Sequence, residues 1–369
     1  MSEFRLTTVE EFEAATARLL ETGAKVGADT WQARVKNQTP HCKFGEEGIC
    51  CRICTMGPCR ITKKAPRGIC GCDVHGIVGR NYLKFTAGGA SAHSDHGREI
   101  CHTLYETSAD GCYKVKDPEK LIRIAKEWDI ETEGKDIYDL AHEVALTGLN
   151  EYGKPFGTQK FLKRAPESQQ KLWEENELAP YAIDREVSRS LHMTHMGCSS
   201  KPEALVKQAI RCGLGDGWGG SMMGTEFSDI LFGTPKPIET EANLGVMVEE
   251  NVNIVVHGHD PSLSEMICEV ADSPEMIAYA KEMGAKGITI SGVCCTSNEV
   301  AMRRGIPMAG NFLQQENVVL TGACEAIVVD VQCIFPALGP LSKCFHTKFI
   351  TTSPIAQMPD SEFIRFDAN

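Results

Sequence analysis

Seven cysteines lie within the short segment from Cys42 to Cys72, and their spacing constrains the fold more than any other feature of this chain. Four of them form the pattern C-x2-C-x4-C-x10-C, namely Cys51, Cys54, Cys59 and Cys70. Gly57-Pro58 and Gly68 lie between them, and both residue types permit the sharp turns that let thiolates converge from several directions. Thiolates in such a loop bind iron–sulfur clusters or zinc.

Two alternatives to an iron–sulfur cluster fit this segment less well. A structural zinc site normally uses two C-x2-C knuckles or a mixture of cysteine and histidine, and only one C-x2-C is present. A disulfide framework requires an oxidising compartment, and nothing near the N-terminus resembles a signal peptide. The 17 cysteines therefore favour metal chemistry in a reducing cytoplasm.

Cys42 and Cys50 precede the four-cysteine pattern and are separated by seven residues. Two thiolates cannot complete a cubane cluster. Either these two cysteines are unrelated to it, or a second subunit supplies two more across a two-fold axis, where a symmetric dimer brings identical patches together.

The length and the net charge of the chain limit the classes of function that it can have. A chain of 369 residues suggests two or three domains. The formal net charge of −12 argues against binding nucleic acid or an anionic membrane surface. No run of eighteen or more apolar residues occurs in the sequence, so we expect no transmembrane helix.

Periodicity predicts a helical half followed by an α/β half. A helix over residues 8–23 starts with a capping box of Thr8 and Glu11. Further helical segments are predicted at 118–128, 137–149, 159–176 and 201–212, and a glycine-rich connector at 213–237. Short β-branched runs at 252–257, 287–291, 326–331 and 348–352 alternate at first with helical patterns such as 262–283 and 298–304. We therefore expect a helical domain over 1–240 and a Rossmann-like parallel domain over 241–369.

Metal-ligand residues follow three of these predicted strands. His257-Gly-His259 comes after the first, Cys294-Cys295 after the second and Cys333 after the third. No G-x-G-x-x-G follows the first strand, so dinucleotide binding is not supported. Because ligands of open α/β sheets gather outside the carboxyl ends of the strands, we expect these side chains to share one edge.

Three histidines in the helical half form a second candidate group. His93, His96 and His102 are spaced by three and six residues, which we take to place them near one helical face. A lone histidine is more often a satisfied core residue. Three histidines near a cysteine region favour proton transfer, because imidazole titrates near neutral pH.

These motifs together resemble anaerobic nickel–iron–sulfur carbon monoxide dehydrogenases of the catalytic-subunit type, over essentially the whole chain. The resemblance implies that Cys42 and Cys50 hold a cluster shared at a homodimer axis, [4Fe-4S] or [2Fe-2S], and that the four-cysteine pattern holds a [4Fe-4S] cluster within each subunit. It implies that H-G-H-x-P, G-V-C-C-T-x-N-E-V and D-x-Q-C supply His259 (His257 as the alternative), Cys295 rather than Cys294, and Cys333 to a nickel–iron–sulfur active cluster. His93 would perform acid–base work, with His96 and His102 carrying protons outward, although Glu99 stands where relatives often have a further histidine.

The resemblance implies reversible oxidation of CO with water to CO2, two protons and two electrons, with a ferredoxin-like acceptor and an acetyl-CoA synthase partner left open. Members of that family continue beyond the position of Asn369 with a domain that supplies three more cysteine ligands and a lysine. We therefore expect an N-terminal part that is inactive alone. Two alternatives stay open, a non-catalytic iron–sulfur electron-transfer protein and a relative of the hybrid-cluster, hydroxylamine-reducing enzymes.

Overall fold

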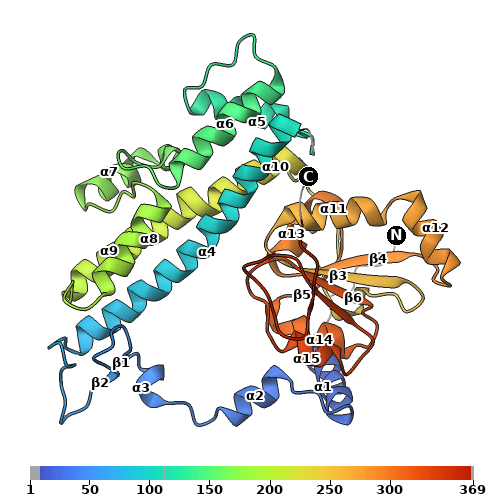
Figure 1. The fold of residues 1–369 in the computed structure, drawn as a ribbon, viewed down its shortest axis with the longest axis horizontal. Coiled ribbons are helices and arrows are strands. Elements are labelled where there is room, and N and C mark those ends of the chain that lie inside the picture. Colours follow the sequence, from blue (N-terminus) through green and yellow to red (C-terminus); the bar gives the residue numbers. More distant parts are fainter. Residues whose placement is uncertain (1–8, 111–112, 367–369) are drawn as a thin grey trace. The chain divides into compact units, whose positions relative to one another are not determined.

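The computed structural model describes residues 9–110 and 113–366, which form two compact units (Figure 1). One unit is bounded by Met1–Thr39 together with Pro235–Asn369, and the other is Pro40–Thr234. The predicted fold class, a helical region followed by a parallel α/β region, is confirmed. None of the helices described is long and apolar enough to cross a membrane.

The α/β unit is built on one six-stranded parallel sheet with the strand order β5-β4-β3-β6-β7-β8. Its strands are β3 (Val252–Gly258), β4 (Ile288–Val293), β5 (Met308–Gly310), β6 (Ala326–Val329), β7 (Lys348–Thr351) and β8 (Glu362–Phe363). The four predicted strands are confirmed to within two residues. The short edge strands β5 and β8 were not predicted, because two or three residues carry no readable periodicity.

The helices of this unit are α1 (Val9–Lys25), α2 (Trp31–Asn37), α11 (Pro261–Ala271), α12 (Pro274–Glu282), α13 (Cys294–Arg304), α14 (Gln315–Leu320) and α15 (Leu338–Ser342), with 3₁₀ turns η3 (Leu244–Val246) and η4 (Phe312–Gln314). Two of the helices, α11 and α12, begin after capping residues, Asp260 and Ser273, with proline in the first position. The single helix predicted over 262–283 is wrong. Ser273 caps a new helix with Pro274 in its first position, which ends α11 and starts α12.

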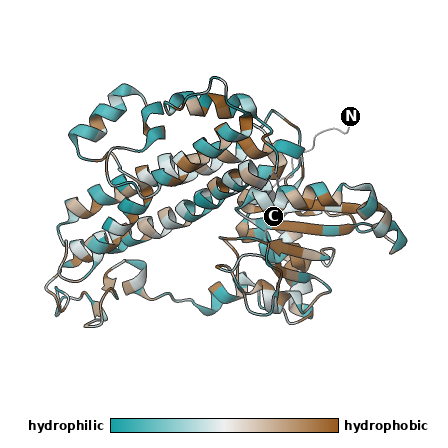
Figure 2. Cartoon of the chain, turned by 45° about the horizontal axis from the view of Figure 1, so that its top comes forward, coloured by the Kyte–Doolittle hydropathy of each residue, from teal (hydrophilic) through white to brown (hydrophobic). Residues whose placement is uncertain are grey.

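The core of the α/β unit lies on the buried central strands, which are brown in Figure 2. Val255, Val293 and Ile327 come from three adjacent strands and are fully buried. Leu19 and Leu20 of α1 pack against the same core, so residues 9–39 belong with this unit and not with the helical segments that follow them. Thr8, half of the predicted capping box, lies outside the described residues.

The helical unit is organised around the long helix α4 (Val74–Asp110), which packs against α6, α8, α9 and α10. Its elements are α3 (Lys43–Glu46), β1 (Cys50–Cys51), β2 (Cys59–Arg60), α4, α5 (Pro118–Glu127), α6 (Ile137–Glu151), η1 (Lys160–Arg164), α7 (Glu167–Glu175), α8 (Ile183–Thr194), α9 (Pro202–Gly215), the π-helix η2 (Asp216–Ser221) and α10 (Met222–Phe232). The helix predicted over 159–176 is divided at Pro166, which precedes α7.

The predicted glycine-rich connector is wrong, since residues 213–232 are helical and run through the π-helix η2. The glycines permit close packing of this segment. A Cβ on Gly219 would lie 2.1 Å from Nε2 of Gln159, and one on Gly220 would lie 3.1 Å from the backbone of His93. π-Helical turns inside α-helices are frequent at functional sites. Here the turn brings Asp216 and Ser221 to His93 on α4.

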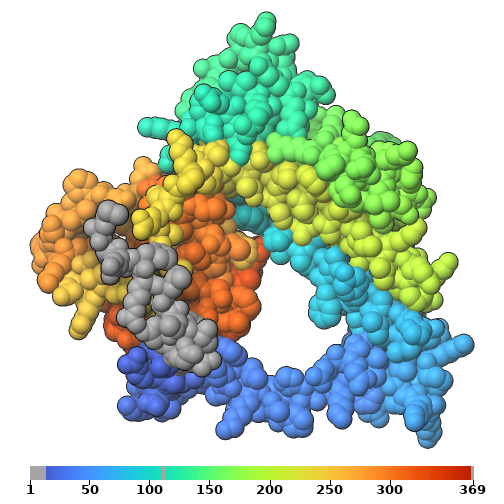
Figure 3. Space-filling model, turned by 180° about the vertical axis from the view of Figure 1, so that it is seen from behind, coloured from blue at the N-terminus to red at the C-terminus, as the bar shows by residue number. Residues whose placement is uncertain are grey.

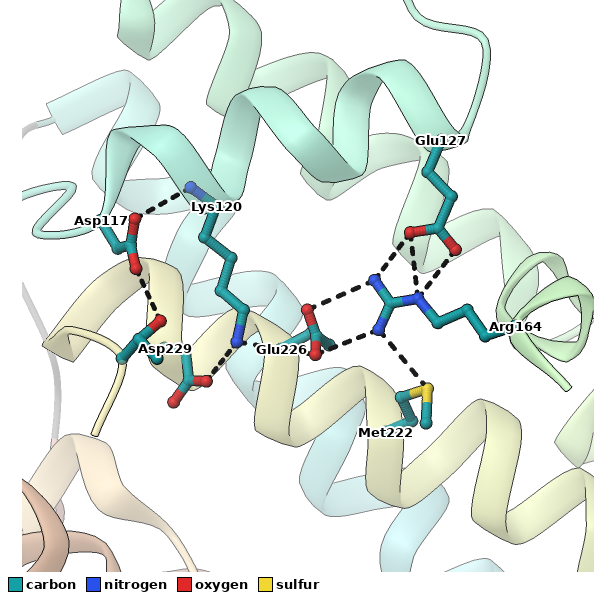
Figure 4. Close-up of polar contacts among 8 residues, drawn as sticks. Asp117, Lys120, Glu127, Arg164, Met222, Glu226 and Asp229 are labelled. Atoms are coloured by element: carbon teal, nitrogen blue, oxygen red, sulfur yellow. Dashed lines mark hydrogen bonds and ion pairs between the residues drawn. The ribbon is translucent and has the colours of Figure 1, made fainter. Parts of the chain in front are cut away.

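A chain of ion pairs joins three elements of the helical unit (Figure 4). The ammonium of Lys120 contacts the carboxylates of Asp229 and Glu226, and Lys120 and Asp229 each have a side chain only 6% exposed. Glu226 also contacts Arg164 at 3.1 Å, and Arg164 binds Glu127 at 2.7 Å. Removing one partner of a buried pair leaves a charge without compensation, which costs more than the pair itself contributes.

We predict that Lys120→Met lowers the free energy of unfolding by about 3–5 kcal/mol, because the buried carboxylates of Asp229 and Glu226 lose the ammonium that they contact. Adding Asp229→Leu to that variant should recover a large part of the loss. Lys171→Met is the control, because its pair with Glu175 is exposed and should contribute below about 1 kcal/mol. Urea denaturation measures all three variants. Equal losses for Lys120→Met and Lys171→Met would contradict this account.

Candidate metal and proton sites

The cysteine segment folds into two short paired strands joined by a tight turn. β1 and β2 are antiparallel, with Cys50 opposite Arg60 and Cys51 opposite Cys59. Gly57 lies in the turn, where a Cβ would come within 3.2 Å of the Cys59 nitrogen and 3.3 Å of the Cys51 oxygen. The glycine therefore lets the loop close tightly enough to bring these cysteines together.

One pocket is lined by all four cysteines of the C-x2-C-x4-C-x10-C pattern and by Cys72. The lining cysteines come from β1, the turn after it, β2 and the loop before α4, so their thiols approach from different directions. Within the described residues, no three histidine, cysteine, aspartate or glutamate side chains converge to hold a single metal ion. Thiols distributed around a pocket fit a cluster of several metal atoms better than one ion.

Cys70 and Cys72 differ electrostatically although they share this pocket. A hydrogen bond from the Cys72 backbone, assisted by the guanidinium of Arg80, lowers the pKa of the Cys70 thiol. Burial raises the pKa of the Cys72 thiol. Since the thiolate is the form that binds metal, this contrast favours Cys70 over Cys72 as a ligand. Arg80 is buried, and its Nε donates to the carbonyl oxygen of Ser199 at 2.8 Å.

Cys42 and Cys50 lie at the surface side of the same segment. Cys42 is exposed and immediately precedes α3, and Cys50 is partly buried beside Cys51. The Nδ2 atom of Asn81 donates to the carbonyl oxygens of Gly48 and Cys50, both at 2.9 Å, which fixes this loop against α4. The segment, drawn in blue in Figure 3, is visible at the molecular surface. The exposed position of Cys42 suits a ligand shared with a second copy.

His93 is held by an acidic partner from the glycine-rich helix. Its Nδ1 lies 2.8 Å from Oδ1 of Asp216 and 3.2 Å from the Ser221 hydroxyl. The hydrogen bond with Asp216 raises the pKa of His93, in opposition to partial burial. The sequence reasoning missed Asp216, because it treated residues 213–237 as a connector. The sequence signal that could have revealed Asp216 is its position between two glycines, with the pair Gly219-Gly220 shortly after it.

The prediction that His93, His96 and His102 share a face is wrong. All three lie on the continuous helix α4. His102 is nine positions after His93, which is about two and a half turns of an α-helix, so the two point in opposite directions. His96 is partly buried, and its ring lies close to Gly224 of α10, whereas His102 is exposed. The roles assigned to these three residues stay predictions.

The predicted ligands of the α/β unit follow three adjacent strands, because β3 lies between β4 and β6 in the sheet. His259 comes just after β3, Cys294-Cys295 begin the helix after β4, and Cys333 follows β6. Parallel strands end at one edge, and the bridge between Gly258 and Cys294 joins the first two loops. The carboxyl edge of this sheet therefore carries all three groups.

Two pairs of candidate ligands lie at this edge, His257 with His259 and Cys294 with Cys295. In each pair the first residue is buried, and the second is at least partly accessible. His257 is fully buried with Nε2 3.1 Å from Oε1 of Gln315, and burial lowers its pKa to about 4. Burial raises the pKa of both thiols, that of Cys294 to about 12, but Cys294 is buried whereas Cys295 is exposed. Cys333 is exposed as well. This favours His259, Cys295 and Cys333 as the metal-facing residues.

A buried carboxylate explains the glycine of H-G-H. Oδ1 of Asp330 accepts the backbone N–H of His259 at 2.5 Å and also that of Val331. Gly258 has φ +130°, and a Cβ there would lie 1.9 Å from Oδ1 of Asp330. Only glycine permits this approach. Asp330 thus joins the loop after β3 to the loop after β6, a role the sequence did not reveal.

Comparison with known proteins shows the family to which this chain is related. Residues 49–369 match the model of the Prismane/CO dehydrogenase family. Carbon monoxide dehydrogenase 1 of Methanosarcina mazei is 46% identical over 362 residues, which cover 97% of this chain and 58% of the relative. The carbon monoxide dehydrogenase/acetyl-CoA synthase subunit beta of Moorella thermoacetica is 42% identical over 89% of this chain and 50% of its own.

The fold also matches solved structures. The nickel-free crystal structure of carbon monoxide dehydrogenase from Thermococcus sp. AM4 superposes with a TM-score of 0.94 at 48% identity, covering 95% of this chain and 57% of that chain. The chain thus spans little more than half the length of these relatives. The cysteine pocket, the ligand-bearing sheet edge and these matches place the chain in the Prismane/CO dehydrogenase family, as a homologue of the N-terminal part of nickel–iron–sulfur carbon monoxide dehydrogenase catalytic subunits.

Proposed function

We propose that this chain is the N-terminal part of an enzyme that oxidises CO with water to CO2, releasing two protons and two electrons. The observation that carries the proposal is the carboxyl edge of β4, β3 and β6, where a histidine and two accessible cysteines follow adjacent strands. A nickel–iron–sulfur cluster bound there would supply the site of a reversible oxidation of CO. His259, Cys295 and Cys333 are the residues of this chain that would hold it.

The cysteine pocket serves electron transfer in this proposal. Its four cysteines Cys51, Cys54, Cys59 and Cys70 would hold a [4Fe-4S] cluster, and the low thiol pKa of Cys70 supports its inclusion. Cys42 and Cys50 would complete a second cluster with the same residues of another copy in a homodimer. The electrons would leave to a ferredoxin-like carrier.

His93 is the proposed proton acceptor. A carboxylate on Nδ1 orients the ring and fixes the proton of the neutral imidazole on that nitrogen, which leaves Nε2 free to accept a proton. The raised pKa strengthens the ring as a base near neutral pH. His96 and the exposed His102 lie farther along the same helix and are proposed to carry protons onward.

Three donors at the sheet edge do not complete a cluster of several metal atoms, so the proposed reaction also requires residues beyond this chain. We propose that those residues belong to the segment by which the relatives are longer, and that this chain alone is inactive. An acetyl-CoA synthase partner is consistent with the name of the Moorella thermoacetica relative. The incomplete donor set also favours a second candidate, a non-catalytic iron–sulfur electron-transfer protein that uses only the cysteine pocket.

The proposed function predicts that nickel and CO oxidation depend on the extended chain. Protein purified anaerobically should contain nickel and reduce viologen with CO only when the chain is extended by the C-terminal segment that its relatives carry. His259→Ala in the extended form should abolish both, and His257→Asn should retain nickel. Iron–sulfur clusters without nickel in both forms would support the electron-transfer alternative. Nickel and CO oxidation in the short form would contradict the proposed need for further ligands.

Cysteine substitutions test the assignment of the pocket. Cys54→Ser should remove about four iron atoms per chain, because the cubane loses one of its four thiolates. Cys72→Ser is the matched control, since Cys72 lines the same pocket and its burial disfavours the thiolate. Iron analysis and EPR of the reduced protein measure the effect. Loss of iron in both variants would show that Cys72 is also a ligand.

The contact between His93 and Asp216 predicts a pH-dependent effect. Asp216→Asn should lower the pKa of His93 towards its ordinary value of 6.5, and Ser221→Ala should change it less. Because the folded-state pKa is raised, the contact stabilises the protein below pH 6.5, and this contribution disappears as the pH rises through the folded-state value. NMR titration of labelled histidine measures the shift. Equal pKa values in the two variants would contradict the role of Asp216.

A further inference from the structure

Gln315 is a fully buried polar side chain beneath the ligand-bearing edge of the sheet. It is the first residue of α14, and its amide group makes four hydrogen bonds. Nε2 donates to the carbonyl oxygen of Cys333 at 2.9 Å and to that of Phe312 at 2.6 Å. Oε1 accepts the N–H of Phe335 at 2.7 Å and contacts Nε2 of His257 at 3.1 Å. All of these residues belong to the α/β unit.

This set of partners fixes the orientation of the amide and the tautomer of the histidine. Two carbonyl oxygens can only accept, so the NH2 group of Gln315 must face Cys333 and Phe312. Oε1 therefore faces His257, and the contact requires a proton on Nε2 of that histidine. A ring whose Nε2 proton is bound to Gln315 does not offer that nitrogen to a metal.

The His257 side chain lies at the junction of the ligand loops. His257 lies opposite Val293, which precedes Cys294, in the pairing of β3 with β4, and its ring contacts Gln315, which also binds the Cys333 carbonyl. The loop after β6 contains two non-glycine residues with a left-handed backbone conformation, Gln332 with φ 69° and Cys333 with φ 58°. Left-handed backbone at such residues persists only where the surroundings hold it. Gln315 supplies that restraint on the Cys333 carbonyl.

We propose that Gln315 is a positioning residue, which binds the Cys333 carbonyl and so holds the Cys333 loop in place at the carboxyl edge of the sheet. The identity of the metal cluster in this inference rests on the proposed function, whereas the restraint on the Cys333 loop does not. Gln315 acts on Cys333 through its backbone carbonyl.

Gln315→Glu is the sharpest test, because it keeps the shape and the acceptor oxygen of the side chain. A glutamate carboxyl has at most one O–H donor, where the glutamine amide has two N–H donors, so at least one of the carbonyl oxygens of Cys333 and Phe312 loses its hydrogen bond and the loop should be released. Thr347→Val is the matched control. Thr347 is also buried, and its hydroxyl donates to the Cys324 carbonyl at 2.8 Å, at the opposite end of β6. Both variants remove a buried hydrogen bond, but only the hydrogen bond of Gln315 lies at the carboxyl edge of the sheet.

The first readout is the rate at which iodoacetamide alkylates Cys333 in the metal-free chain, followed by peptide mass spectrometry. Gln315→Glu should raise this rate severalfold and leave alkylation of Cys344 unchanged, and Thr347→Val should leave both unchanged. The second readout is nickel content in the extended form. Gln315→Glu should lower nickel affinity by about tenfold, as loss of a group that orients a metal ligand commonly does.

Unchanged alkylation of Cys333 in Gln315→Glu would overturn the proposal, and so would an equal increase in Thr347→Val. Iron bound in the cysteine pocket should be the same in all forms, which separates local release from general unfolding. If the unsubstituted extended form lacks nickel, the proposed function fails. A faster reaction of Cys333 in Gln315→Glu would still support the positioning role in that case.

Discussion

The parallel pairing of β3 with β4 and β6 is the constraint on which the candidate metal site depends. Three segments that are distant in sequence become neighbours only because their strands run side by side in one direction, so their carboxyl ends meet at one edge. The loops there are then held by buried polar side chains, Asp330 beneath His259 and Gln315 beneath Cys333. Apolar packing builds the sheet, and a small number of satisfied hydrogen bonds set the ligand loops.

In the helical unit, close packing of glycine-containing backbone positions the functional side chains. Glycines in residues 213–224 allow the π-helix η2 to lie directly against α4, where a Cβ would collide with the opposing chain. This close contact places Asp216 at the His93 ring. The cysteine pocket depends on turns at Gly57 and Gly68 in the same way. In both places glycine residues, rather than apolar packing of the core, determine where the functional side chains meet.

Sequence reasoning predicted the elements that carry strong periodicity and the ligand residue types. It located the four longer strands, the shared edge and the cysteine segment, since spacing and alternation are local properties. It failed at His102, because the helical step was misjudged, and at residues 213–232, because glycine reads as a loop when tertiary packing holds it in a helix. Asp330 and Gln315 were missed for a related reason, since their partners are set by strand order and not by neighbouring sequence.

The account depends on one central claim, that the carboxyl edge of β4, β3 and β6 binds a nickel–iron–sulfur cluster through His259, Cys295 and Cys333. Anomalous diffraction at the nickel and iron absorption edges, from anaerobic crystals of the chain extended to the length of its relatives, tests it most directly. The account predicts iron and nickel peaks at this edge, with His259 as a ligand and His257 still bound to Gln315. An edge without metal, or a cluster held by His257 or Cys294, would contradict it.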